Sequence, residues 1–295
     1  MSPRDAASVL SGPSRPLAAA GWMVGAIISF GAMAIAGREL SAELDTFEIM
    51  AYRSAIGLPI ITAMLLATYG PAGMRTRQPG AHLTRNVIHF AAQNFWFFGI
   101  ATIPLAQLVA IEFTNPIWVA LFAPLLLGER MTRAGMIAAA LGFAGVLIVT
   151  RPGLAPLGPG HAAALAAAIG FALTNIWTKR LSRMDGTLNI LFWMTLSQML
   201  MGIACALPGG ITVPSTALAP WVLFVGICGL TAHFSLTRAL FAAPATVVAP
   251  MEFMRLPAIA IAAALIYGEP LEIAVFVGAA LILAGNLVNL RGARR

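Results

Sequence analysis

The sequence has few charged residues. Only 10% of its 295 residues are Asp, Glu, Lys or Arg, whereas 59% are hydrophobic. Soluble globular domains carry roughly a quarter charged residues. This imbalance argues against a soluble protein and indicates a polytopic membrane protein, in which about 20 apolar residues are needed for each crossing of the bilayer.

Lysine and cysteine are almost missing. The only lysine, Lys179, falls at an expected helix end, which argues against a retinal-type photoreceptor because that class needs a buried lysine. The two cysteines, Cys205 and Cys228, both fall inside apolar runs. No CxxC pair or Cys/His cluster accompanies them, so they are interpreted as small apolar residues rather than as a disulfide or a metal site.

The sequence also lacks the motifs of several enzyme classes. It has no GxxxxGK[ST] loop, which argues against direct use of ATP by this chain. An integral-membrane enzyme acting on lipids or isoprenoids would show clustered carboxylates or histidines with metal spacing, or a nucleophile beside its base. Neither pattern occurs, so we expect no catalytic residue, no metal and no cofactor, and such an enzyme is the least favoured alternative.

What the sequence does contain is a series of apolar runs separated by charges, proline and glycine. They predict an all-α polytopic membrane protein with ten spans. The first run follows a 16-residue polar tail and is too long for a signal-peptide core, so it is interpreted as a retained helix. The predicted spans are residues 17–37, 47–69, 84–102, 105–127, 131–150, 160–180, 187–207, 219–240, 243–267 and 271–290.

Basic residues are distributed unevenly around these spans. If the N-terminus is cytoplasmic, the inside segments hold fourteen basic residues, and the outside segments hold only Arg38 and Arg151. This asymmetry follows the positive-inside rule and would be lost if one span were added or removed. We therefore expect both termini in the cytoplasm and a bacterial-type inner membrane. These anchors account for the net charge of +7, so the bilayer is an expected partner and nucleic acid is not.

Two stretches of the chain, 111–130 and 251–270, resemble each other at an offset of 140 residues. The same offset joins Glu112 with Glu252, Phe113 with Phe253, Gly128 with Gly268, Glu129 with Glu269, Pro104 with Pro244, Leu141 with Leu281, Gly145 with Gly285, Arg151 with Arg291 and Asp45 with Asp185. Each half then contains five spans. Because five is odd, the second half must enter the membrane from the opposite side. Inverted repeats are typical of secondary transporters, whose site lies between the halves.

Each half also carries a short signature at the end of its fourth span. The first half has Leu-Leu-Gly-Glu at 126–129 and the second has Ile-Tyr-Gly-Glu at 266–269, and each precedes a helix rich in small residues. This pattern resembles the ten-helix EamA-type branch of the drug/metabolite transporter superfamily, over nearly the whole chain. The resemblance implies a secondary transporter, and the family handles amino acids, nucleotide-like metabolites, vitamins and drugs.

On this resemblance we expect two EamA-type repeats at 17–150 and 160–290, with a cytoplasmic tail at 1–16, a linker at 151–159 and a basic tail at 291–295. The bacterial aromatic amino-acid exporters are the members chosen for comparison. The expected function is therefore export of small amphipathic metabolites, above all amino acids including aromatic ones, by alternating access around a central cavity. The alternative is uptake of a flat metabolite such as a vitamin or nucleoside derivative.

Four ionisable side chains inside the spans are candidates for substrate or ion handling, because charge at bilayer depth is costly and is kept facing a cavity or the protein interior. Arg255 follows Glu252 by three residues, the spacing at which helical side chains meet, so the two form either an internal ion pair or a carboxylate anchor. Glu112 has no such partner in its own helix, because Asn115 stands where Arg255 stands in the repeat. Glu112 is therefore either a proton carrier or a neutral carboxyl group bonded to another helix. Arg53 is the alternative anchor.

A polar stripe on the span at 84–102 completes the candidate site. Asn86, His89 and Gln93 share one helical face that lipid cannot satisfy, so it must line a cavity or another helix. His233 falls at the position equivalent to Gln93. Deep tryptophans either stack on a flat substrate or fill volume between helices. The candidate cavity for a small-molecule substrate comprises His89, Gln93, Trp96, Asn115, Trp118, Asn175, His233 and Arg255.

Small residues are dense in the fifth and tenth predicted spans. They allow two helices to approach closely, either as a seam within the chain or as a dimer contact. We expect a monomer, with a dimer as the alternative. Glu129 and Glu269, in loops predicted on opposite faces, are expected to cap or tether the helix that follows.

Overall fold

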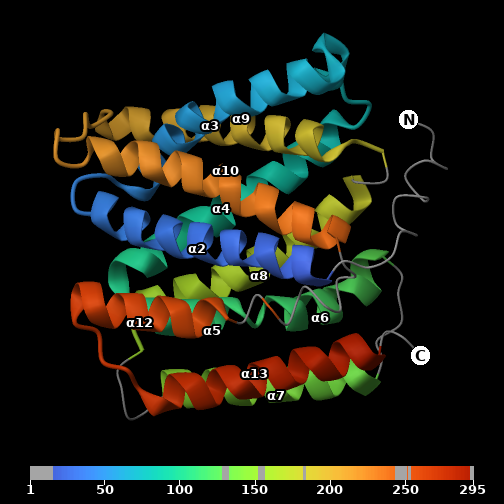
Figure 1. Cartoon of the computed structure of the whole chain (residues 1–295), viewed down its shortest axis with the longest axis vertical. Coiled ribbons are helices and arrows are strands. Elements are labelled where there is room, and N and C mark those ends of the chain that lie inside the picture. Colours follow the sequence, from blue (N-terminus) through green and yellow to red (C-terminus); the bar gives the residue numbers. More distant parts are fainter. Residues whose placement is uncertain are drawn as a thin grey trace.

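The computed structural model describes residues 16–127, 133–151, 157–181, 184–242, 251 and 254–292. Within these ranges every regular element is helical. The α-helices are α2 (Pro16–Leu40), α3 (Thr46–Tyr69), α4 (Pro79–Thr102), α5 (Leu105–Glu112), α6 (Asn115–Leu127), α7 (Arg133–Thr150), α8 (Pro159–Leu181), α9 (Thr187–Ala206), α10 (Ala219–Ala242), α12 (Arg255–Tyr267) and α13 (Ile273–Gly292), and the short 3-10 helices are η1 (Pro71–Met74) and η2 (Leu207–Gly209). Figure 1 shows the long helices stacked side by side, with α3 and α9 at one end of the stack and α7 and α13 at the other.

Proline, aspartate and glycine fix several helix boundaries. α4 and α8 begin at Pro79 and Pro159, where the missing N–H costs no hydrogen bond. α3 is capped by Asp45, because its carboxylate accepts from the Glu48 N–H and the Glu48 carboxylate accepts from the Asp45 N–H, both at 2.8 Å. α12 ends at Gly268, whose φ of +66° is the left-handed conformation that closes a helix. Most predicted spans therefore agree with helices to within a few residues, although α4 begins earlier than expected.

The offset of 140 residues reappears in the helix bounds, because α10 repeats α4 and α12 repeats α6 at this displacement. The main contacts pair helices from opposite halves: α2 packs on α10, α4 on α8, α3 on α9 and α7 on α13. If each helix is replaced by its equivalent in the other half, the contact between α2 and α10 becomes the contact between α8 and α4. The contacts between α3 and α9 and between α7 and α13 stay the same. The halves are therefore interleaved, and facing helices belong to different repeats.

Glycines form the seam between α7 and α13. A Cβ atom on Gly145 would lie 2.6 Å from the carbonyl oxygen of Gly278, and a Cβ on Gly278 would lie 2.6 Å from the carbonyl oxygen of Gly145. The two backbones approach so closely that neither position has room for a side chain. The predicted small-residue contact is therefore a seam inside the chain, between helices of opposite halves.

Within the described ranges, five helices are long and apolar enough to cross a membrane: Leu17–Leu40, Thr46–Tyr69, Pro159–Thr178, Thr187–Gly209 and Ala219–Leu236. Shorter apolar helices cover Ala139–Val149, Arg255–Tyr267 and Ile273–Gly285. α4 has 24 residues, but its polar side chains lower its hydropathy, and most of these point into the protein. The protein is thus an all-helical membrane protein, and the count of ten spans stays a prediction.

Candidate functional site

The fourth predicted span is broken. α5 ends at Glu112 and α6 begins at Asn115, so the expectation of one continuous helix over 105–127 is wrong. At the break, the Thr114 N–H donates to the Ile111 carbonyl oxygen at 3.0 Å, which is a turn rather than a helical hydrogen bond. Broken helices within membranes are found where the freed backbone lines a cavity or is buried in protein.

The equivalent span of the second half is interrupted at the equivalent residue. The Met254 N–H donates to the Met251 carbonyl oxygen at 3.1 Å, and α12 begins at Arg255. Discontinuous helices in corresponding positions of two repeats mark the substrate site in many secondary transporters. Both breaks therefore point to the same part of the molecule as the candidate site.

An ion pair joins the two breaks. Oε1 of Glu112 lies 2.6 Å from Nη2 of Arg255, and the indole N–H of Trp96 donates to Oε2 of Glu112 at 2.9 Å. The two charged side chains are only 15% and 11% exposed. Each charge also lies at a helix end whose dipole has the same sign, which is unfavourable. Glu112 stands at the negative C-terminus of α5, and Arg255 at the positive N-terminus of α12. Each residue therefore depends on the other for compensation.

This pairing adds a partner that the sequence interpretation did not name. Arg255 was expected to pair with Glu252, which lies outside the described residues, so that contact stays a prediction; within the described residues Arg255 pairs with Glu112. Glu112 was expected to be either a proton carrier or a neutral carboxyl group bonded to another helix. It does bond to other helices, through Arg255 of α12 and Trp96 of α4, and the proton-carrier role stays a prediction.

Aromatic rings surround the Arg255 guanidinium. Its carbon lies 5.1 Å from the ring centre of Phe30 and 4.9 Å from that of Phe113, which is cation–π geometry. Phe30 also packs edge-on against His233, with ring centres 5.4 Å apart. Trp96, Arg255 and His233 of the predicted cavity are thus linked in one region, through Glu112 and Phe30.

His89 lies on the buried face of α4 and packs against Phe171 of α8, with ring centres 5.7 Å apart. It is 5% exposed, and neither ring nitrogen has a hydrogen-bond partner among the described residues. A neutral imidazole has one donor and one acceptor, and leaving both buried without partners is costly. Gln93, one turn further along α4, is also buried. His89 therefore has both a donor and an acceptor without a partner among the described residues.

The remaining predicted cavity residues connect α6 to its neighbours. The Asn115 side-chain amide donates to the Ala168 carbonyl oxygen at 3.2 Å, and its Oδ1 accepts from Asn175 at 3.1 Å. Trp118 donates to the Thr114 hydroxyl at 3.1 Å. The asparagine contacts hold α6 against α8, and the Trp118 bond to Thr114 spans the break. The substrate role expected for Asn115, Asn175 and Trp118 stays a prediction.

Comparison with known proteins agrees with these observations. The model of the EamA-like transporter family matches residues 17–151 and again 158–291. The chain belongs to the EamA-like transporter family. Similar proteins include the riboflavin transporter of Rhizobium johnstonii (31% identical; 96% of this chain, 94% of that one) and the S-adenosylmethionine uptake transporter of Rickettsia prowazekii (25% identical; 90% of each chain). A crystal structure with 20% identity covers 94% of this chain and 98% of its own, with a TM-score of 0.66, and shows a common fold.

The names of these relatives bear on one expectation. This EamA-like transporter was expected to export amino acids, and the relatives named here are a riboflavin transporter and an S-adenosylmethionine uptake transporter. Neither name mentions export.

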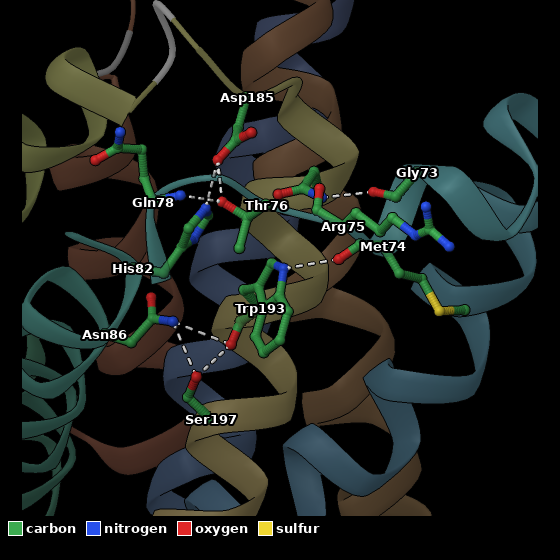
Figure 2. Close-up of polar contacts among 11 residues, drawn as sticks. Gly73, Met74, Arg75, Thr76, Gln78, His82, Asn86, Asp185, Trp193 and Ser197 are labelled. Carbon is green, nitrogen blue, oxygen red and sulfur yellow. Dashed lines mark hydrogen bonds and ion pairs between the residues drawn. The ribbon is translucent and has the colours of Figure 1, made fainter. Parts of the chain in front are cut away.

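A polar network that sequence reasoning missed joins two loops of this EamA-like transporter (Figure 2). Oδ2 of Asp185 accepts from the Thr76 hydroxyl at 2.7 Å and lies 2.8 Å from Nε2 of His82. Trp193 of α9 donates to the carbonyl oxygen of Met74, at the end of η1, at 3.0 Å. The repeat match of Asp185 with Asp45 drew attention to Asp185, but it did not identify Thr76 and His82 as its partners.

Loops at the other end of α3 are tied in a comparable way. The Ser215 N–H donates to Glu43 at 2.9 Å, and the Thr212 N–H donates to Glu48 at 2.6 Å. The bond from Ser215 lowers the pKa of Glu43, because it favours the ionised carboxylate. Both ends of this EamA-like transporter are thus held by contacts between its halves.

Glu269 makes a second connection that the sequence only outlined. It was expected to cap or tether the following helix, whereas it forms an ion pair with Arg38 of α2 and accepts the Leu105 N–H of α5 at 3.0 Å. Arg38 in turn donates to the carbonyl oxygens of Ile100, at 2.8 Å, and Ile103. The equivalent Glu129 lies outside the described residues. Glu269 therefore closes the junction between α2, α4, α5 and the loop before α13.

Proposed function

We propose that this protein is a secondary transporter that takes up a flat heteroaromatic metabolite of the vitamin or nucleoside class. In this proposal ten spans form two inverted five-helix repeats, both termini are cytoplasmic, and the bacterial inner membrane is the site of action. Access to a site between the repeats alternates as they rock against each other.

The observation that carries the proposal is the junction of the two broken spans. Glu112 and Arg255 meet there, with Trp96, Phe30 and Phe113 around them. Sites for small molecules are mostly apolar and aromatic, with a few placed polar groups. Aromatic faces suit a flat heterocycle, and the unpartnered nitrogens of His89 supply a donor and an acceptor for its heteroatoms.

The names of the relatives favour this class of substrate over amino acids. Riboflavin and S-adenosylmethionine, which appear in the relatives' names, each contain a flat nitrogen heterocycle with polar substituents. The shared chemistry is the heterocycle, which supports uptake of such a compound by this chain.

The test is transport into liposomes that contain the purified protein. Riboflavin, S-adenosylmethionine, tryptophan and phenylalanine are offered separately, with empty liposomes as the blank. Saturable entry of a heterocyclic compound, inhibited by unlabelled riboflavin, is expected. His89→Gln should raise the KM for that compound, whereas the matched change His161→Gln should not, because His161 is already bonded to Gln107 at 3.0 Å. Saturable movement of the amino acids alone would overturn the proposal.

A further inference from the structure

A small pocket lies between α3, α9 and α10, away from the ion pair that joins the broken spans. Its lining includes Arg53 and Ser54 of α3, Thr195 and Gln198 of α9, and Gly226 and Gly229 of α10. α3 belongs to the first repeat and the other two helices to the second. The pocket is therefore formed between the repeats.

Glycine allows the Arg53 guanidinium to lie against α10. A Cβ atom on Gly229 would lie 2.7 Å from Nε of Arg53, so any larger residue would displace the side chain. Arg53 is 5% exposed, and one of its terminal nitrogens lies 3.7 Å from the sulfur of Met50. A thioether is a weak acceptor and carries no charge, so it does not compensate a guanidinium.

The other buried arginines of this chain are better satisfied. Arg255 pairs with Glu112 and Arg38 with Glu269. Arg85 donates to the oxygens of Thr178 and Asn86, both at 3.1 Å. Arg53 alone among these four has neither a carboxylate nor an oxygen acceptor in contact within the described residues. A buried charge without such compensation is costly, and in membrane proteins it is a sign of function.

The rest of the pocket lining adds polar groups but no acid. Gln198 is 1% exposed, and its side-chain nitrogen has no partner among the described residues. The Thr195 hydroxyl already donates to the Leu191 carbonyl oxygen at 2.8 Å. The guanidinium of Arg53 and the amide of Gln198 therefore both need acceptors, and the guanidinium also needs a negative charge.

An apolar ligand would leave these donors unsatisfied, and a cation would be repelled. Water could accept the hydrogen bonds but would not neutralise the charge. A negatively charged acceptor is the ligand that meets every requirement, and guanidinium groups bind oxyanions in two-pronged geometry.

The size of the pocket limits how much of a ligand it can hold. Its cavity volume is about 10 Å³, close to the space that one water molecule needs, so without movement of the lining only one small group of a ligand can enter. We propose that the Arg53–Gln198 pocket binds a single oxyanion group, either a free ion such as inorganic phosphate or a carboxylate or phosphate group on a larger compound.

The experiment measures thermal unfolding of the purified protein in detergent. Inorganic phosphate or acetate is titrated against chloride at equal ionic strength, and riboflavin 5′-phosphate is compared with riboflavin in chloride buffer. A ligand that binds only the folded state stabilises it by RT ln(1 + [L]/Kd), so Tm rises with ligand concentration once that exceeds Kd. We expect such a rise with at least one oxyanion, from which an apparent Kd is fitted, and a loss of about tenfold or more in apparent affinity in Arg53→Gln and in Gln198→Leu.

Arg238→Gln is the matched control, because Arg238 lies on an exposed part of α10, over the Trp22 ring at 5.4 Å. It should retain the wild-type response. A response to inorganic phosphate or acetate assigns a free ion, and a response to riboflavin 5′-phosphate but not to riboflavin or inorganic phosphate assigns an attached group. No response of the wild type to any oxyanion, or equal responses in wild type and Arg53→Gln, would overturn the proposal. None of these readouts requires transport, so they are independent of the proposed function.

Discussion

The carboxylate of Glu112 lies 2.6 Å from the guanidinium of Arg255, although the two residues are 143 positions apart in the chain. They stand at the ends of two broken spans that belong to opposite repeats. Each residue is fixed to its own helix end, so movement of one repeat against the other must stretch or break this contact. The pair is thus placed to couple a change at the candidate site to the relative position of the halves.

The first prediction concerns the coupling of this pair. Glu112→Gln leaves a largely buried guanidinium without its counter-ion and should lower stability by about 3 kcal/mol, the usual cost of breaking one side of a buried ion pair. Glu112→Gln with Arg255→Gln removes both charges and should recover part of the loss. Denaturation of both single variants and the double variant in detergent measures the coupling. If the double variant loses the sum of the two single effects, the residues do not act as a pair.

Sequence reasoning predicted the helices well, because the information it needs is local. Apolar runs locate the spans, and residues such as Pro79, Asp45 and Gly268 fix their ends through missing N–H groups, capping bonds and positive φ. The break after Glu112 was missed although a local signal stands beside it. Thr114, Asn115 and Pro116 interrupt the apolar run, and an Asn-Pro pair is a turn signal, but spans assigned from apolar runs alone do not register it.

The site was harder to predict because its contacts join distant residues. The i, i+3 spacing pointed from Arg255 to Glu252, whereas the partner found in the structure lies in the other repeat. Asp185 was noted only as a repeat match, and its bonds to His82 and Thr76 depend on the packing of two loops. Pairing between interleaved repeats is a property of three-dimensional packing, and a single sequence does not contain it in readable form.

The second prediction concerns the junction closed by Glu269. Its carboxylate neutralises Arg38 and accepts the Leu105 N–H at the start of α5, where negative charge is favourable. Glu269→Gln should weaken both interactions and open the junction more often. A cysteine introduced at Ser41, in a background without the two native cysteines, should then react faster with a polar thiol reagent.

Glu272→Gln is the control for this experiment. Glu272 also forms an ion pair, with Arg151, but these side chains are 29% and 39% exposed, against 14% for Glu269 and 18% for Arg38. Exposed ion pairs contribute little to stability, so labelling at position 41 should change little. Equal acceleration by both variants would show that Glu269 has no special part in closing the junction.

The third prediction concerns the Asp185 network, beside the C-terminal end of α3 (Figure 2). Asp185 accepts from Thr76 at 2.7 Å and contacts His82 at 2.8 Å. Thr76 lies just before α4, and His82 lies near its start. Asp185→Ala removes both contacts and should destabilise the protein by about 1–3 kcal/mol, as expected when buried polar groups lose their partners. Thr68→Val is the control, since its hydroxyl is exposed and bonds only within α3, to the Met64 carbonyl oxygen at 2.7 Å. Equal Tm values for the Asp185 variant and the wild type would contradict this role.

The fourth prediction concerns the glycine seam between α7 and α13. Gly278→Val places side-chain atoms where even a Cβ would lie 2.6 Å from the Gly145 carbonyl oxygen and 2.5 Å from a methyl group of Val149. Because two backbones meet there, the clash can be relieved only by separating the helices, and overpacking of this kind costs about 1–3 kcal/mol or more. Gly21→Ala in α2 is the control, since nothing lies within 4 Å of its Cβ position. A lower Tm and a smaller yield of monodisperse protein are expected for Gly278→Val alone. If that variant unfolds like the wild type, the seam tolerates a wider spacing and is not a fixed contact between the halves.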